Sequence, residues 1–196
     1  MSRKLALLIS NNQYADANLA KLAAPQADAI ALVAVLRDPA SGGFDDVQTL
    51  INQPSAEIRH AIGSFFYGKQ PSDTLLLYFS GHGLLDDYAR LYLACADSDI
   101  KLPRARSVEA SYIAQEMDGC RCKRQLLILD CCYGGAFRQG IAKSGRNQPV
   151  QTNTIFDGDS RVVLAASDAT QYAFEDDKLV GDTACVRSLP TIWWKG

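Results

Sequence analysis

Two short motifs place a histidine and a cysteine among residues that suit nucleophilic catalysis. The motif Ser80–Gly83 contains His82, and the motif Asp130–Gly135 contains Cys132. A thiol attacks a carbonyl carbon well only as the thiolate, and a nearby imidazole can take its proton and return one to a leaving amine. Glycines beside both residues allow a substrate backbone to approach closely. The two motifs together predict a cysteine peptidase.

Each motif directly follows a continuous apolar run. Leu75–Phe79 precedes the histidine motif, and Leu126–Leu129 precedes the cysteine motif. Runs of this kind are typical of parallel strands that are covered on both faces. Ligands of an open parallel sheet bind in the crevice outside the carboxyl ends of its strands. We therefore expect His82 and Cys132 to lie past two strand ends and to face one crevice.

Strand-like runs alternate with helical patterns along the chain. The expected strands are Lys4–Ser10, Val47–Ile51, Leu75–Phe79, Leu126–Leu129 and Arg161–Ala166, with Arg90–Cys95 as a short segment able to pair as a hairpin. The expected helices are Pro25–Arg37, Ser55–Tyr67 and Val108–Met117, the last capped by Ser107. This alternation predicts an α/β sandwich with a mainly parallel sheet.

Composition excludes several classes of protein. The chain has 196 residues, 47% of them hydrophobic, which fits one domain with a sizeable core. A formal net charge of -2 gives no basic surplus for binding nucleic acid. No apolar stretch approaches the roughly 18 residues that cross a bilayer, and the segment Lys4–Ile9 is too short for the core of a signal peptide. We expect a soluble cytoplasmic protein without a membrane partner.

The six cysteines are expected to be free thiols. They are Cys95, Cys120, Cys122, Cys131, Cys132 and Cys185. A reducing compartment keeps thiols reduced. The spacing does not match paired zinc knuckles, and the chain has two histidines. Four of the cysteines, Cys95, Cys120, Cys122 and Cys185, are interpreted as small residues packed in or beside strands.

The segment 138–160 is expected to be a long, flexible surface loop. It is polar, is rich in glycine, and carries Arg138, Lys143 and Arg146. Exposed loops of this kind are favoured sites of proteolytic cleavage. A peptidase that cuts after basic residues could process itself here, and a simple flexible connection fits the composition equally well.

At these motifs the sequence resembles the caspase-like peptidases of family C14, and most of all metacaspases and bacterial caspase-like proteins. A strand ending in Ser-Gly-His-Gly and a strand ending in Asp-x-Cys are signatures of that family. His82 also lies 50 residues before Cys132, which is the caspase spacing. The segments Ile9–Tyr14, Ala24–Ala29 and Leu164–Ser167 are similar to further family segments. The resemblance covers about residues 4–176.

The resemblance implies a caspase-like three-layer α/β/α sandwich that forms a single domain over residues 1–196. Residues 1–137 would be similar to the large subunit, 138–160 would be a flexible loop, and 161–196 would be a partial or divergent small subunit. After Gly181 the sequence departs from the family pattern. The domain is therefore expected to be truncated, divergent, or completed by an activating partner or an additional chain.

The resemblance also assigns roles to individual residues. Cys132, rather than Cys131, would be the nucleophile and His82 the base, with the amides of Gly83 and Cys132 forming the oxyanion hole. No cofactor is required for this chemistry. Calcium activation, common among metacaspases, would need carboxylates in surface loops, and Asp97 and Asp99 are available.

The resemblance implies cleavage after basic residues. Asp28, Ser80 and Asp130 match the residues with which metacaspase-like enzymes bind arginine or lysine before the cleaved bond. A carboxylate pair could hold a guanidinium through charge-assisted hydrogen bonds. On the residues alone, Asp28 could instead stabilise a helix N-terminus and Asp130 could cap a turn. The expected partner is a protein or peptide substrate with a basic residue at this position.

Two other functions fit parts of the sequence. Cys132 and Arg138 form a Cys-x5-Arg spacing after a strand, as in cysteine-dependent phosphatases, in which backbone amides and an arginine bind the phosphate. That interpretation leaves the motif Ser80–Gly83 without a role. A catalytically weak caspase-like scaffold or regulatory module is favoured by the divergent C-terminal segment and disfavoured by the intact His82 and Cys132.

Overall fold

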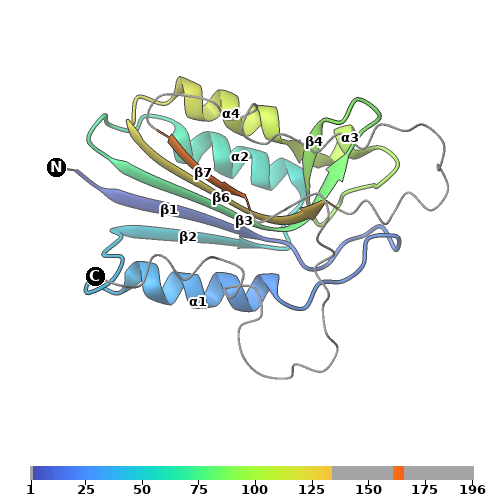
Figure 1. The fold of residues 1–196 in the computed structure, drawn as a ribbon, viewed down its shortest axis with the longest axis horizontal. Coiled ribbons are helices and arrows are strands. Elements are labelled where there is room, and N and C mark those ends of the chain that lie inside the picture. The colour runs from blue at the N-terminus through green and yellow to red at the C-terminus, as the bar shows by residue number, and fades with distance from the viewer. Residues whose placement is uncertain (1, 134–160, 166–196) are drawn as a thin grey trace.

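A mainly parallel sheet forms the centre of the molecule, which we describe from a computed structural model for residues 2–133 and 161–165. The parallel strands are β1 (Lys4–Ser10), β2 (Asp46–Ile51), β3 (Thr74–Leu85), β6 (Arg124–Tyr133) and β7 (Arg161–Ala165). They lie in the spatial order β2-β1-β3-β6-β7. Two short antiparallel strands, β4 (Leu91–Ala94) and β5 (Ser107–Glu109), extend the sheet from the far end of β3 (Figure 1).

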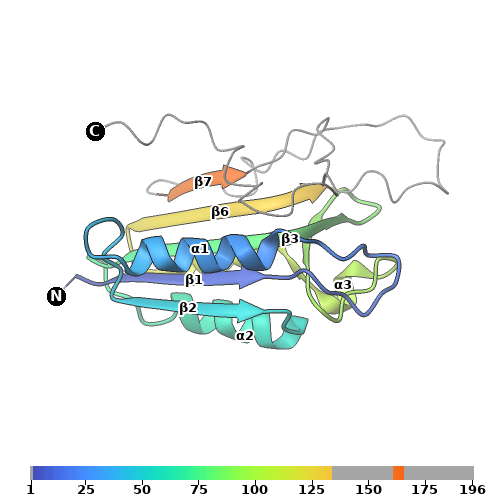
Figure 2. The same ribbon diagram turned by 90° about the horizontal axis from the view of Figure 1, so that it is seen from below.

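Helices cover both faces of this sheet and make three layers. Helix α1 (Pro25–Arg37) lies on one face, and α2 (Ser55–Phe66) and α4 (Ala110–Gly119) lie together on the other (Figures 1 and 2). A single turn, α3 (Pro103–Arg106), stands beside β4. The predicted three-layer α/β/α sandwich is confirmed. Within the described residues, no helix is long and apolar enough to cross a bilayer.

Two apolar cores alternate along each strand because successive side chains of a strand point to opposite faces. In β3, Leu75, Leu77 and Phe79 pack toward α2 and α4, whereas Leu76 and Tyr78 pack toward α1. The strands β1 and β6 follow the same alternation. Continued along β3, it assigns Ser80 and His82 to the α1 face of the sheet.

The strands that carry the two motifs are longer than the sequence predicts. We expected β3 to end at Phe79, but it runs to Leu85, because it stays paired with β6 as far as Gly83 and then pairs with β4. Strand β6 likewise runs to Tyr133. His82 and Cys132 therefore lie inside strands near their carboxyl ends, and not after them as predicted.

The predicted helix cap at Ser107 is wrong. Ser107 begins β5, which pairs with β4, and α4 starts three residues later at Ala110. Its hydroxyl lies 2.7 Å from the Ser98 hydroxyl, in a buried hydrogen bond. A helix cap is a local preference worth about 1 kcal/mol, and strand pairing outweighs it here.

The amino ends of the strands are tied together by a buried carboxylate. The side chain of Asp73 accepts hydrogen bonds from the backbone N–H groups of Gln70, at 2.9 Å, and Arg3, at 3.1 Å. The thiol of Cys122 donates to the Asp73 carbonyl at 3.0 Å. The Gln70 contact is the main reason that the Asp73 pKa lies below its usual range. These hydrogen bonds hold the amino ends of the strands together.

Candidate active site

His82 and Cys132 occupy the same level of two adjacent parallel strands. They are direct register partners in the β3–β6 ladder, as are Ser80 and Asp130 two residues earlier. Neighbouring strands lie about 4.8 Å apart, so the two backbones bring the histidine and the cysteine positions next to each other. The imidazole of His82 is largely buried, with 9% of its surface exposed. The sheet thus juxtaposes the two residues that the sequence motifs single out.

The carbonyl of Ala20 orients the imidazole of His82. The Nε2 atom lies 2.9 Å from that carbonyl oxygen. Because a carbonyl oxygen only accepts hydrogen bonds, Nε2 carries a hydrogen in this contact. In the neutral ring, Nδ1 is then the nitrogen that can take up a proton. No sequence motif indicates Ala20, because the contact uses its backbone.

Tyr14 supports His82 from the same loop. The Tyr14 hydroxyl accepts a hydrogen bond from the His82 backbone N–H at 3.1 Å and donates one to the Asn11 carbonyl at 2.6 Å. The tyrosine ring lies against the imidazole, with 5.0 Å between the ring centroids. Burial is the main cause that raises the Tyr14 pKa far above its usual range, so the phenol keeps its proton. The aromatic residue fixes both the backbone and the ring of His82.

Close packing explains the glycine before His82. A Cβ atom at Gly81 would lie 3.0 Å from the Asn11 carbonyl oxygen and 3.1 Å from the Tyr14 hydroxyl. Both distances are shorter than ordinary van der Waals contacts. Any side chain at this position would push Tyr14 away from His82, so Gly81 permits the support just described.

A polar cluster lies two residues before the His82–Cys132 level. The carboxylate of Asp130 accepts hydrogen bonds from the Ser80 hydroxyl at 3.3 Å and from the Tyr78 hydroxyl at 3.4 Å. The structure therefore brings the predicted residues Ser80 and Asp130 together. Sequence reasoning missed Tyr78, although its spacing of two residues from Ser80 on one strand was a usable signal.

Asp28 approaches this cluster from α1. It lies in the first turn of the helix, with 5% of its surface exposed, and its Oδ2 atom has no hydrogen-bond partner among the described residues. Burial raises the Asp28 pKa, and the charge of Asp130 raises it further. Desolvation and a like charge both disfavour the ionised form. The three predicted residues therefore lie near one another, with Asp28 and Ser80 buried and Asp130 partly buried.

The distance between the two levels suits a long side chain. Two residues of a strand span about 6.6 Å. A substrate carbonyl at the level of His82 and Cys132 would need an extended side chain to reach Asp130 and Ser80. The arrangement can therefore combine attack on a carbonyl with the binding of a distant cation.

Other predicted residues have different surroundings. Gly83 is the register partner of Tyr133 on one side and of Leu93 on the other. Asp97 accepts hydrogen bonds from the backbone N–H of Ser55, at 2.7 Å, and from its hydroxyl, at 3.1 Å. Asp99 accepts one from the Lys101 backbone. The described part of the chain contains no cluster of three histidine, cysteine or acidic side chains able to hold a metal.

The described cysteines other than Cys132 are free thiols. Cys95, Cys122 and Cys131 are buried and Cys120 is partly buried. Cys131 belongs to the core under α2 and α4, opposite to the face that carries Tyr78. Burial is the main cause that raises the Cys95 pKa to about 12, which makes this thiol inert. Cys185, Arg138 and the predicted loop 138–160 lie outside the described residues.

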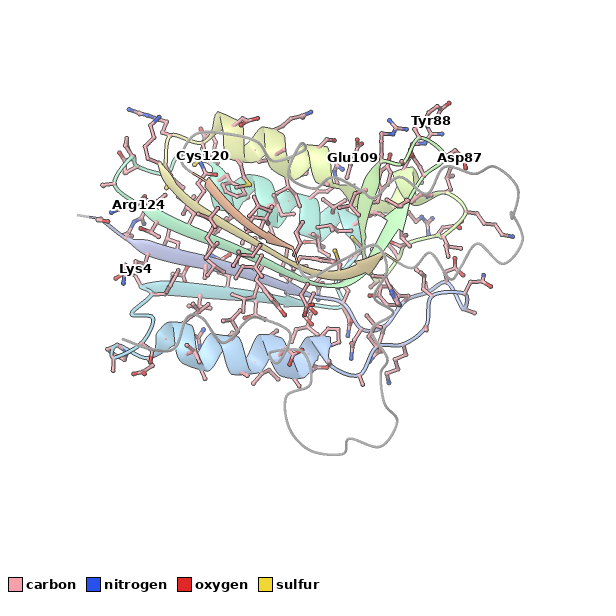
Figure 3. The ribbon with its side chains drawn as sticks, in the orientation of Figure 1. Lys4, Asp87, Tyr88, Glu109, Cys120 and Arg124 are labelled. Atoms are coloured by element: carbon pink, nitrogen blue, oxygen red, sulfur yellow. The ribbon has the colours of Figure 1, made fainter. Side chains whose placement is uncertain are left out.

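Four of the residues labelled in Figure 3 mark the two ends of the sheet. Lys4 and Arg124 begin β1 and β6 at the end that Asp73 ties together. Asp87 and Tyr88 lie at the other end, on the turn between β3 and β4. The candidate site is near the carboxyl ends of the parallel strands, away from these two cations.

Comparisons with known proteins agree with this fold. A family model described as the caspase domain of Peptidase_C14 matches residues 3–184. The structure of pro-sf-caspase-1 is similar, with a TM-score of 0.52 and 16% identity over 74% of this chain and 55% of that one. A protein from Geobacter sulfurreducens has a TM-score of 0.54 and 21% identity over 68% of this chain and 52% of that one. The chain thus spans about half the length of these structures. No curated protein is similar enough to count as a match.

Proposed function

Because the chain belongs to the caspase-domain family Peptidase_C14, we propose that it is a cysteine endopeptidase of the metacaspase type that cleaves after arginine or lysine. The observation that supports this most is the register of the β3–β6 ladder. It sets Cys132 beside His82 and puts the Asp130 carboxylate two residues away on the same pair of strands. Nucleophile, base and a binding site for a cation then lie within one side chain's reach.

In the proposed mechanism, the Cys132 thiol gives its proton to Nδ1 of His82 and the sulfur attacks the substrate carbonyl. The amides of Gly83 and Cys132 donate to the oxyanion that forms in the transition state. The imidazolium then protonates the leaving amine, and an acyl-enzyme is left on the sulfur. Water, deprotonated by the imidazole, hydrolyses the thioester and releases the acid. Both reacting groups are side chains of the protein, so we propose that the chemistry requires no cofactor.

The contacts of His82 support its role as base. The Ala20 carbonyl holds the hydrogen on Nε2, so Nδ1 is available for the proton of the thiol. As the ring becomes charged, the same carbonyl stabilises the imidazolium through a charge-assisted hydrogen bond. Tyr14 limits the movement of the residue by binding its backbone. His82 would therefore act from a fixed position, which lowers the entropy cost of proton transfer.

The carboxylates of Asp28 and Asp130 support basic specificity. We call the pocket that they and Ser80 would form the first pocket, because it would receive the side chain before the cleaved bond. Burial is the main cause that raises the Asp28 pKa, and the charge of Asp130 raises it further, because the two carboxylates repel each other. A bound guanidinium or ammonium would remove that repulsion. An acidic substrate side chain would increase it, so cleavage after aspartate is disfavoured.

The surroundings of the domain enter the proposal in four ways. A completing chain or activating partner is supported by the coverage of about half of the matched structures and by two exposed apolar residues on β7, Val162 and Leu164. Self-processing within residues 138–160 would follow from basic specificity. We also propose a cytoplasmic location and, as a regulatory input separate from the chemistry, activation by calcium through Asp97 and Asp99.

A catalytically weak scaffold or regulatory module is the second candidate. It is favoured by the departure of the sequence from the family pattern after Gly181. A phosphatase that uses Cys132 and Arg138 gives no role to the contacts of His82. Release of inorganic phosphate that depends on Arg138 and not on His82 would support it.

Cleavage of fluorogenic peptides ending in arginine, lysine or aspartate tests the proposal. Purified protein should cleave the arginine and lysine peptides, with activity lost in Cys132→Ala and in His82→Ala. Measurements with and without calcium test the regulatory part separately. Cleavage that survives Cys132→Ala, or that is confined to the aspartate peptide, would contradict the proposal. No cleavage in any condition would favour the scaffold.

A further inference from the structure

Unpaired polar atoms gather at one place in the described structure. Buried side-chain oxygen atoms of Ser10, Asn11 and Asp28 have no hydrogen-bond partner there, and a fourth such atom, on Gln125, lies at the opposite end of the sheet, near the start of β6. Ser10 and Asn11 stand at the carboxyl end of β1, and Asp28 is in the first turn of the helix that follows. Buried polar groups without a partner are uncommon in native proteins and call for a specific explanation. A ligand that donates hydrogen bonds would provide one.

Ser10 continues the polar level of Ser80 and Asp130 onto a third strand. It is the register partner of Ser80 in the β1–β3 ladder, and Ser80 is in turn the partner of Asp130. In β1, the alternate residues Ala6 and Leu8 belong to the core under α1, so Ser10 falls on the same face. Ser10 is fully buried. One level of the sheet thus carries three polar residues, with Asp28 on the helix that covers this face.

Asn11 does not share this position. Its side-chain amide donates to the Ala94 carbonyl at 2.8 Å, and the chain has left β1 at this residue. Its backbone carbonyl accepts from Tyr14. Asn11 therefore takes part in the support of His82. Among the described residues, Ser10 and Asp28 are then the two with an unpaired buried oxygen on the α1 side of the sheet.

We propose that Ser10 is a specificity residue that makes the first pocket prefer arginine to lysine. The inference rests on the proposed function and adds to it a residue and a choice between two cations. The Asp130 carboxylate already accepts hydrogen bonds from Ser80 and Tyr78 on one oxygen. The two unpaired acceptors, on Asp28 and Ser10, come from α1 and β1, whereas the Asp130 charge comes from β6, which β3 separates from β1. A suitable ligand must donate in several directions at once.

A guanidinium meets this requirement better than an ammonium. Its five N–H donors form a planar fork, so one group can reach acceptors on different strands. The three donors of an ammonium surround a single compact atom that is strongly hydrated. Lysine would satisfy the carboxylates and leave the Ser10 hydroxyl unpaired. A pocket discriminates effectively between two ligands when one of them leaves a buried polar group of the protein unpaired and the other does not.

The variant Ser10→Ala tests the proposal, with Ser64→Ala on the exposed surface of α2 as its control. Binding is measured by calorimetry in the Cys132→Ala protein with agmatine and cadaverine, which carry the end groups of arginine and lysine. Cleavage of arginine and lysine peptides is measured with Cys132 intact. Ser10→Ala should reduce the preference for the guanidinium in both assays by about tenfold and change cadaverine binding little. The Ser64→Ala protein should behave like the wild type.

The two assays separate failure of this inference from failure of the proposed function. An unchanged arginine-to-lysine ratio in Ser10→Ala, or no binding of agmatine to the Cys132→Ala protein, overturns the role of Ser10. If agmatine binds in a Ser10-dependent way and no peptide is cleaved, the pocket stands and the peptidase proposal fails. Circular dichroism spectra identical to the wild type exclude loss of the fold, since the substitution removes a single oxygen atom.

Discussion

His82 and Cys132 are register partners on two adjacent parallel strands, and Cys131 precedes Cys132 by one residue. Cys131 packs in the core under α2 and α4. The Cys131 thiol is thus part of the packed core, and this leads to the first prediction.

Cys132→Ala should abolish peptide cleavage, with a fall in kcat of about 1000-fold or more. Cys131→Ala should keep the activity within about twofold and lower the free energy of unfolding by about 1 kcal/mol, because it removes a buried sulfur. Fluorogenic cleavage and urea unfolding measure the two effects. Greater loss of activity in Cys131→Ala than in Cys132→Ala would contradict the assignment.

Asp28→Asn and Asp130→Asn should each lower kcat/KM for an arginine peptide by about 10- to 100-fold. Each removes a charge that would bind the guanidinium, and hydrogen bonds to charged groups contribute about 1.5–3 kcal/mol. Asp87→Asn, on the exposed turn after β3, serves as the matched control and should have no effect. Full activity of both pocket variants would show that the cation binds elsewhere.

The change in Tm that Asp28→Asn causes, relative to the wild type, should depend on pH. Burial and Asp130 raise the Asp28 pKa, so the folded protein binds this proton more tightly than the unfolded chain does. The stability that the protonated carboxyl contributes is complete below the unfolded pKa of about 4 and is lost as the pH rises through the folded pKa. Asp28→Asn should therefore raise the Tm at pH 7 and raise it less at pH 3.5.

Asp38 provides a control of opposite sign. Its hydrogen bonds, first with the Ser41 hydroxyl and then with the Ala40 N–H, lower its pKa. The stability from an ionised group of this kind is present above the unfolded pKa and is lost as the pH falls through the folded pKa. Asp38→Asn should lower the Tm at pH 7 more than at pH 3. Equal shifts at both pH values in either variant would refute the argument.

Tyr14→Phe should lower kcat by about tenfold and leave KM nearly unchanged. The change keeps the ring against His82 and removes the hydroxyl that joins the His82 N–H to the Asn11 carbonyl. Two buried backbone groups then lose their partner, so the imidazole is held less firmly. Tyr67→Phe, at a side chain that is 85% exposed, is the control. A rise in KM at constant kcat would mean that Tyr14 binds substrate instead.

Asp97→Ala should destabilise the protein by about 1 kcal/mol in the absence of calcium. Pro54 precedes α2 and offers no side-chain cap, and the Asp97 carboxylate accepts from the Ser55 backbone in its place. Asp99→Ala, at an exposed residue, should have a much smaller effect. Urea unfolding compares the two variants. No difference between the two variants without calcium would contradict the role of Asp97 as a cap, and the proposed binding of calcium is tested separately by repeating the measurement with calcium added.

The sequence predicted most of the fold because continuous apolar runs specify buried strands directly. The expected limits of β1 and α1 agree with the structure. The expectations failed where pairing between distant segments decides the outcome. The extension of β3 to Leu85 depends on β4, and the strand β5 replaces the expected start of a helix. Neither segment carries a local pattern that would reveal its partner.

The sequence predicted the residues that carry the chemistry of the site. It did not predict the residues that hold them in place. Motifs led to His82 and Asp130 because their types and spacing carry chemistry. The contacts from Ala20 and Tyr14 come from a loop and depend on how it folds over β3. Ser10 lies in a run that reads as an ordinary buried strand. Its significance comes from register and from an unpaired oxygen, which only coordinates reveal.

The carboxylate of Asp73 has a consequence for motion in the sheet. It fastens the amino ends of the strands, whereas unpaired polar atoms of Ser10 and Asp28 lie at the carboxyl ends. Thermal opening of the domain should therefore begin at the carboxyl ends and spread away from them. The backbone amide proton of Leu75 should exchange with deuterium more slowly than that of His82. A bound cation would pair with the polar atoms at the carboxyl ends and slow the opening there. The sheet could then admit a substrate and become more rigid around it while its amino ends stay hydrogen-bonded.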